Sequence, residues 1–131
     1  MTTKKFYLLA KNKLFKINRS ITGPGNRMTL RYIKKYFFNL KIKSFKSGTK
    51  VYDWKIPHEW NVSDAYIKDK YGKKIIDFKE NNLHLVGYSK SIKKKITFRS
   101  LLAKHLHTNK IQQDAIPYVT SYYKKDWGFC I

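Results

Sequence analysis

Apolar residues recur at helical spacing along the first third of the chain. Between residues 4 and 16 they lie three and four positions apart, which predicts a first amphipathic helix over 4–16. Gly and Pro interrupt this pattern within 18–26. Asn26 can cap a second amphipathic helix that we expect from Met28 to about Leu40. The chain therefore begins with a predicted pair of helices.

After residue 40 the spacing of apolar residues shortens toward two, which is the spacing typical of strands. We expect short strands over 40–45 and 51–56, each closed by Gly or Pro. Two further apolar runs, 65–69 and 74–78, flank a short polar stretch and predict a hairpin. Gly72 supplies the positive φ that its tight turn needs.

Strand and helix signals alternate in the last third. We expect a strand over 83–88, a helix over 98–107 capped by Thr97, and extended structure over 115–123. The predicted fold class is α+β, with a helical pair followed by a β-rich region that contains one short helix.

The chain closes on five largely apolar residues, 127–131. Because termini normally lie at the surface, this composition favours a chain that is cut short. The alternative is a final strand that is buried in a sheet.

Charge bears on the possible partners. The 131 residues carry a net charge of +21, and residues 1–52 hold 14 Lys and Arg with no Asp or Glu. Such asymmetry is a hint of contact with a polyanion. Only four of the basic residues are Arg, which makes the bidentate contacts to phosphate and guanine, so biased codon usage is the favoured interpretation. A small module that binds single-stranded nucleic acid through Lys and aromatic rings remains the alternative function.

Cysteine content and hydropathy indicate a compartment. Cys130 is the only cysteine, so no internal disulfide forms. No signal-peptide core and no run of about 18 apolar residues is present, and we expect a cytoplasmic protein without a membrane span. The basic helix near the N-terminus would also suit a membrane surface.

Metal-binding and nucleophilic residues are sparse. The imidazoles are those of His58, His84, His105 and His107. On a helix, His105 and His107 would point ~200° apart and could not share a metal, whereas on a strand they could. No carboxylate lies at a suggestive spacing, and nothing local activates the Cys130 thiol. We predict no metal site and no nucleophile in this chain.

Two further patterns have ordinary explanations. Asp53 and Glu59, near Trp54 and Trp60, could form an acid–base pair in a sugar site, but loop and strand carboxylates are the favoured interpretation. The loop 22–26 lacks the Gly-Lys-Ser/Thr ending of a phosphate loop and follows a helix, so it is read as a helix start.

Three long stretches together resemble a prokaryotic family of aminopeptidase-like proteins, which are zinc-dependent exopeptidases with an inserted domain of unknown function. The first matching segment is NRSITG at 18–23 with GNRMTL at 25–30. The second is SGTKVYDWKIP at 47–57 with its continuation to 67, and the third is DAIPYVTSYY at 114–123 with DWGFC at 126–130. Their order and spacing agree over nearly the whole chain.

The resemblance implies a domain organisation. Residues 1–46 would begin an α/β exopeptidase fold, which stays incomplete here, and residues 47–131 would form most of a small jelly-roll-like insert. The zinc ligands of such proteins lie further along, beginning with a His-rich segment that contains Asn-Asp and has no counterpart here. No catalytic, cofactor-binding or metal-binding residue is therefore carried over.

The resemblance also implies partners and context. The rest of the aminopeptidase-like domain is the expected partner, and a homo-oligomer is possible. Family members are commonly encoded beside polysaccharide biosynthesis genes. Because amide hydrolysis needs a metal-bound water and a carboxylate base, we expect the 131-residue chain alone to be inactive and free of zinc.

Overall fold

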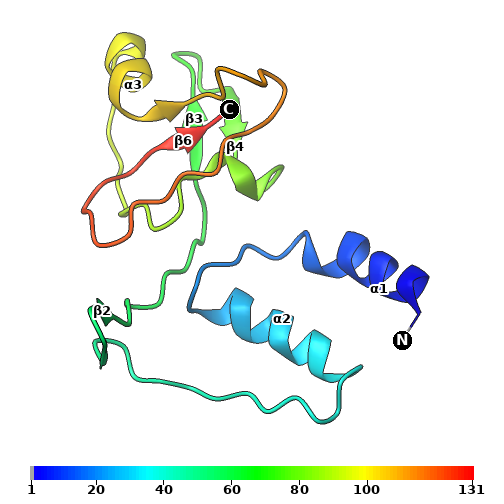
Figure 1. The fold of residues 1–131 in the computed structure, drawn as a ribbon. Coiled ribbons are helices and arrows are strands. Elements are labelled where there is room, and N and C mark those ends of the chain that lie inside the picture. Colours follow the sequence, from blue (N-terminus) through cyan, green and yellow to red (C-terminus); the bar gives the residue numbers. More distant parts are fainter. Residues whose placement is uncertain (1) are drawn as a thin grey trace. The chain divides into compact units, whose positions relative to one another are not determined.

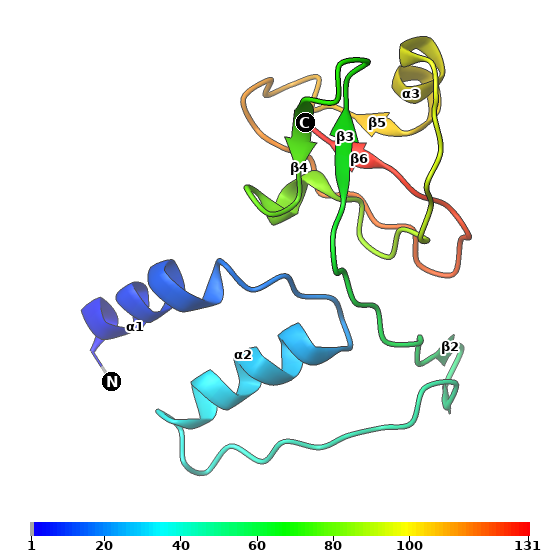
Figure 2. The same cartoon turned by 180° about the vertical axis from the view of Figure 1, so that it is seen from behind.

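The computed structural model describes residues 2–131 and divides the chain into two compact units (Figures 1 and 2). Unit 1 covers Met1–Asn61 and unit 2 covers Val62–Ile131. Helices and short strands occur together, which confirms the predicted α+β class. The expected division into a peptidase part at 1–46 and an inserted part at 47–131 stays a prediction.

The first predicted helix is confirmed. Helix α1, Thr3–Leu9, continues as a π-helical turn, η1, over Ala10–Leu14. The Oγ1 atom of Thr2 caps it by accepting a hydrogen bond from the backbone N–H of Lys5 at 3.4 Å. Of its apolar stripe, Leu9 and Leu14 are buried.

The second predicted helix begins earlier and ends earlier than expected. Helix α2, Pro24–Lys34, has Gly23 as its N-cap with φ +130°, so Asn26 is inside the helix and is not its cap. Pro24 suits the first turn because a backbone N–H at this position would have no acceptor within the helix. Beyond Lys34 the predicted continuation to Leu40 is wrong, since this part of the chain has no packed surface on which an apolar helical face could rest.

Two strand predictions in unit 1 are wrong. Residues 40–45 form no strand, because no neighbouring segment pairs with their backbone. The predicted strand 51–56 is instead a tight antiparallel hairpin of β1, Lys50–Val51, and β2, Trp54–Lys55. Its turn places Tyr52 at φ +54°, which a continuous strand would not allow.

The predicted hairpin of unit 2 is confirmed. Strands β3, Tyr66–Lys68, and β4, Lys74–Asp77, pair antiparallel, and Gly72 has φ +88° in their turn. The Oδ1 atom of Asp69 closes the turn by accepting hydrogen bonds from the backbone N–H groups of Tyr71 and Lys73, each at 2.9 Å.

Two further predictions in unit 2 are wrong in part. The strand expected over 83–88 starts with a different structure, and the helix expected over 98–107 ends early. A 3₁₀ turn, η2, covers Asn82–His84, because the Asn81 side chain caps it and ends strand geometry there. Helix α3 covers Phe98–Lys104, and Thr97 caps it as predicted. Leu106–His107 turns away as β5, which pairs in parallel with β6, Phe129–Cys130.

The core of unit 2 forms around the last segment of the described chain. Leu101, Trp127 and Phe129 make up a buried cluster. Partly buried apolar side chains packed against this cluster are Ala65, Ile67, Ile76, Leu85, Ile96 and Leu106. The apolar segment at 127–131 thus includes the buried strand β6. Extended structure at 115–123 contributes one parallel bridge, between Gly87 and Thr120.

Candidate functional site

Two of the candidate histidines anchor the segment that contains strand β6. The Nδ1 atom of His84 lies 2.7 Å from the carbonyl oxygen of Cys130, and Nδ1 of His105 lies 2.9 Å from that of Trp127. A carbonyl oxygen only accepts, so each Nδ1 carries the proton and donates it. The His105 ring also stacks on Trp127, with centroids 3.8 Å apart. These imidazoles hold the last strand in place.

The described residues do not offer a zinc site. Within residues 2–131 no group of three or more His, Cys, Asp and Glu side chains could hold a metal ion. His105 caps the C-terminal end of α3, whereas His107 lies in β5. The two histidines therefore do not lie on one helix or one strand. The donor set of the described residues does not fit zinc.

The candidate thiol is enclosed. Cys130 is the most deeply buried side chain of the described residues. Burial raises the pKa of the Cys130 thiol, and a hydrogen bond with the backbone of Val119 offsets this rise in part. A thiol of this kind stays protonated and is a poor nucleophile.

The candidate carboxylate pair is not supported. Glu59 forms a bidentate ion pair with Arg27, whose Nη2 lies 3.1 Å from Oε2 of Glu59, while Asp53 lies in the β1–β2 turn. The hydrogen bond from Arg27 lowers the pKa of Glu59. A carboxylate that is held ionised in this way is unsuited to donate a proton as a general acid.

The Gly-Pro-Gly loop positions the start of α2, as predicted. A Cβ atom on Gly25 would lie 1.9 Å from the carbonyl oxygen of Asn18, and one on Gly23 would lie 3.2 Å from that of Trp60. The hydroxyl of Thr22 donates to the carbonyl oxygen of His58 at 3.4 Å. Backbone contacts this close require glycine, and they join the loop to the segment around Glu59.

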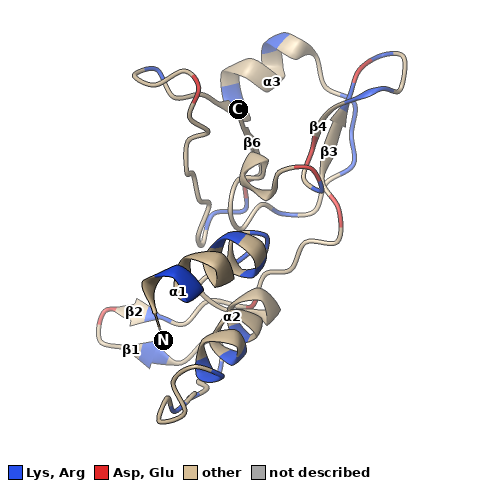
Figure 3. Cartoon of the chain, turned by 90° about the vertical axis from the view of Figure 1, so that its right-hand side faces the viewer, with Lys and Arg blue, Asp and Glu red and all other residues tan. Residues whose placement is uncertain are grey.

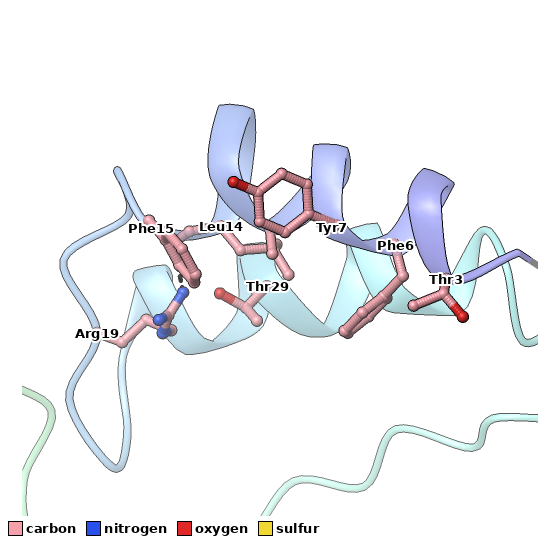
Figure 4. A pocket seen from close by; sticks show the side chains of 8 residues that line it. Thr3, Phe6, Tyr7, Leu14, Phe15, Arg19 and Thr29 are labelled. Atoms are coloured by element: carbon pink, nitrogen blue, oxygen red, sulfur yellow. Dashed lines mark hydrogen bonds between the residues drawn. The ribbon is translucent and has the colours of Figure 1, made fainter.

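An open apolar hollow of about 540 Å³ lies between α1 and α2. Figure 4 shows Thr3 and Phe6 at one end of it and Phe15 and Arg19 at the other. Its lining also includes Tyr7, Ala10, Leu14 and Thr29. Arg19 donates a hydrogen bond to the carbonyl oxygen of Leu14, which holds the Arg19 side chain at its end of the hollow.

The hollow belongs to a larger exposed surface of unit 1. We define the unit 1 apolar face as the large apolar side chains of α1, α2 and the segment up to residue 45 that stay exposed, namely Phe6, Tyr7, Leu8, Phe15, Met28, Tyr36, Phe37, Phe38, Ile42 and Phe45. Lys and Arg lie on both helices (Figure 3). Unit 1 therefore leaves many large apolar side chains exposed.

Comparison with known proteins identifies the family. Residues 59–131 match a family described as "Domain of unknown function (DUF2172)". The chain belongs to the DUF2172 family. The matched residues include all of unit 2, with its histidine-anchored strand.

Two relatives of this DUF2172 protein come from Clostridium acetobutylicum. One, named "Putative polysaccharide biosynthesis protein with aminopeptidase-like domain", is 51% identical over 119 residues, which make up 91% of this chain and 27% of the relative. The other is the crystal structure of a "putative peptidase", with a TM-score of 0.88 and 49% identity over 98% of this chain and 30% of that chain. The chain thus spans between a quarter and a third of the relatives that it matches.

Sequence reasoning did not find the roles of His84 and His105 in this DUF2172 chain. Their partners are backbone carbonyls 46 and 22 residues away, and no local spacing reports such contacts. The hollow was also missed, although the apolar stripe of α1 indicated that one face of the helix needed a partner. No helix in residues 2–131 is long and apolar enough to cross a bilayer.

Proposed function

We propose that this DUF2172 chain is the N-terminal part of a zinc-dependent aminopeptidase-like hydrolase of the cytoplasm. The observation that carries the proposal is the match of 98% of the chain to 30% of a peptidase-like structure at a TM-score of 0.88. In this proposal the zinc ligands and the carboxylate base belong to the part of the larger protein that lies beyond the matched segment. In the same proposal, residues 47–131 form most of a domain inserted in that hydrolase.

The role of unit 1 in this proposal is to complete the peptidase fold by packing. Helix α2 has no fully buried side chain, and Leu30 and Ile33 on its apolar side are only partly buried. An isolated helix of 11 residues is marginal in water, and most helical stability comes from burial of an apolar face. The remaining part of the larger protein would cover the unit 1 apolar face, including the hollow beside Phe6 and Phe15.

The experiment compares the 131-residue chain with the full-length Clostridium acetobutylicum relative. We expect the full-length relative to hold stoichiometric zinc and to hydrolyse an aminoacyl p-nitroanilide, with loss of activity after chelation. The 131-residue chain alone should do neither. One equivalent of tightly bound zinc in the 131-residue chain would overturn the proposal, as would a full-length relative that neither binds zinc nor cleaves any aminoacyl substrate.

A further inference from the structure

Two segments of unit 2 that are far apart in sequence, around Gly87 and around Thr120, run side by side (Figures 1 and 2). Four tyrosines belong to these segments. The ring centroids of Tyr88 and Tyr122 lie 4.6 Å apart with 50° between their planes. Those of Tyr122 and Tyr123 lie 6.4 Å apart at 43°. Tyr118 is near enough to Tyr122 to raise the pKa of its hydroxyl. We call these four residues the tyrosine cluster.

The backbone beneath the tyrosine cluster is firmly held. The N–H of Gly87 donates to the carbonyl oxygen of Val119 at 2.9 Å, and the N–H of Ser121 donates back to that of Gly87 at 2.8 Å. The buried hydroxyl of Ser121 donates to the same Gly87 carbonyl at 3.2 Å. Rings on such a base are pre-positioned, which lowers the entropic cost of binding a ligand.

Two members of the cluster hold their rings at a conformational cost. Tyr88 has φ +63° and Tyr123 has φ +54°, in the left-handed region that bulky side chains avoid. Gly or Asn would satisfy either backbone position without strain. Backbone strain of this kind is enriched at binding sites.

The exposed rings and their hydroxyls define the chemistry that the cluster offers. Tyr118 is 80% exposed and Tyr123 is 65% exposed, whereas Tyr88 and Tyr122 are partly buried below them. Each phenol hydroxyl both donates and accepts hydrogen bonds. Burial raises the pKa of Tyr122, and the neighbouring Tyr118 and Tyr88 raise it further, so this hydroxyl keeps its proton. A ligand with apolar faces and many hydroxyls matches such a surface.

Positive charge borders the cluster. Lys90, Lys124 and Lys125 are exposed and stand within two or three residues of the tyrosines. One carboxylate, that of Asp126, follows them in sequence. The surroundings therefore favour a ligand that carries negative charge.

We propose that the tyrosine cluster is a binding site for an acidic polysaccharide. Pyranose rings would stack their C–H faces on Tyr118 and Tyr123, sugar hydroxyls would pair with the phenols, and uronate groups would face the bordering lysines. Single-stranded nucleic acid could also stack on tyrosine. The sugar is favoured because its hydroxyls match groups that both donate and accept, whereas phosphate only accepts and is best held by Arg.

The test is calorimetric titration of the 131-residue chain with oligogalacturonate, a neutral cello-oligosaccharide and oligo(dT). We expect oligogalacturonate to bind, and to bind more tightly than either of the other two. The double variant Tyr118→Ala with Tyr123→Gly should weaken that binding by about tenfold or more, because it removes both exposed stacking faces. Glycine relieves the strain at position 123, so thermal unfolding of this variant should show a retained fold.

The chain supplies a matched control. Tyr52 also has a positive φ, +54°, is 92% exposed, and belongs to unit 1, so Tyr52→Gly makes the same change away from the cluster. Unchanged affinity in Tyr52→Gly supports the site. The proposal is overturned by absence of oligogalacturonate binding, by equal binding in the double variant, or by tighter oligo(dT) binding that the double variant loses. Because the site lies within unit 2, a negative peptidase assay would leave it standing.

Discussion

Unit 2 closes its core with its last strand, whereas unit 1 leaves an entire helix without a buried side chain. Trp127, Phe129 and Leu101 pack together in unit 2, and the two anchoring histidines hold the segment from Trp127 to Cys130. In unit 1, α2 is amphipathic and yet has no buried residue. The difference indicates that unit 2 is stabilised from within, while unit 1 depends on a partner surface.

The largest expected contrast lies between two phenylalanines. Phe129 is 7% exposed in the core of unit 2, and Phe38 is 84% exposed in unit 1. Phe129→Ala should lower the free energy of unfolding by about 3–5 kcal/mol, enough to unfold a marginal domain. Phe38→Ala should change it by no more than about 0.5 kcal/mol. Urea denaturation of both variants measures the difference, and equal losses would contradict the comparison.

A glycine substitution probes the closest glycine–backbone contact described in unit 1. Because a Cβ on Gly25 would overlap the carbonyl oxygen of Asn18, Gly25→Ala must displace α2 from its loop. We expect a loss of about 1–3 kcal/mol, seen as reduced helical circular dichroism. Gly72→Ala is the control, since nothing lies within 4 Å of its Cβ and only its φ of +88° opposes the change. A Gly25→Ala chain with unaltered helicity would argue against this packing.

Thiol reactivity tests whether unit 2 stays closed. Cys130 is buried and burial raises its thiol pKa, so both access and the thiolate fraction are reduced. We expect reaction with a disulfide reagent to be more than about tenfold slower in native protein than in urea. Phe129→Ala should remove this protection. Rapid reaction of the native chain would show that β6 is not docked.

The smallest effect concerns the exposed ion pair of unit 1. The folded-state pKa of Glu59 is lowered by Arg27, so its stabilisation is present above the ordinary carboxyl pKa and is lost as the pH falls through the lowered value. The difference in melting temperature between the parent chain and Glu59→Gln should therefore be small at neutral pH and vanish in acid. Added salt should also reduce it. A difference that grows in acid would reverse this assignment.

Local signals decided which elements could be predicted. The hairpin around Gly72 and the Thr97 cap of α3 depend on residues next to them, and both predictions were confirmed. The strand expected over 83–88 is reduced to isolated bridges of Leu85 and Gly87 with Phe129 and Thr120, more than 30 residues away. Alternation in sequence does not report where a partner strand lies.

The same limit applies to the sites. The apolar stripe and the basic face of the first helix were visible in the sequence, but the hollow needs Thr29 of α2 as well. The tyrosine cluster joins Tyr88 to residues near 120, which only the folded backbone brings together. Left-handed φ at a tyrosine has no sequence signal, since glycine and asparagine are the usual residues there.

Hydrogen exchange tests the central claim most directly, measured on the 131-residue chain and on the full-length Clostridium acetobutylicum relative. In the chain alone, amides of α1 and α2 should exchange at least about tenfold faster than those of α3 and β6. In the full-length relative, the segments that match α1 and α2 should become as protected as the rest, while the unit 2 segments stay unchanged. Equal protection of α1 and α2 in the two proteins would contradict the dependence of unit 1 on the remainder of an aminopeptidase-like protein.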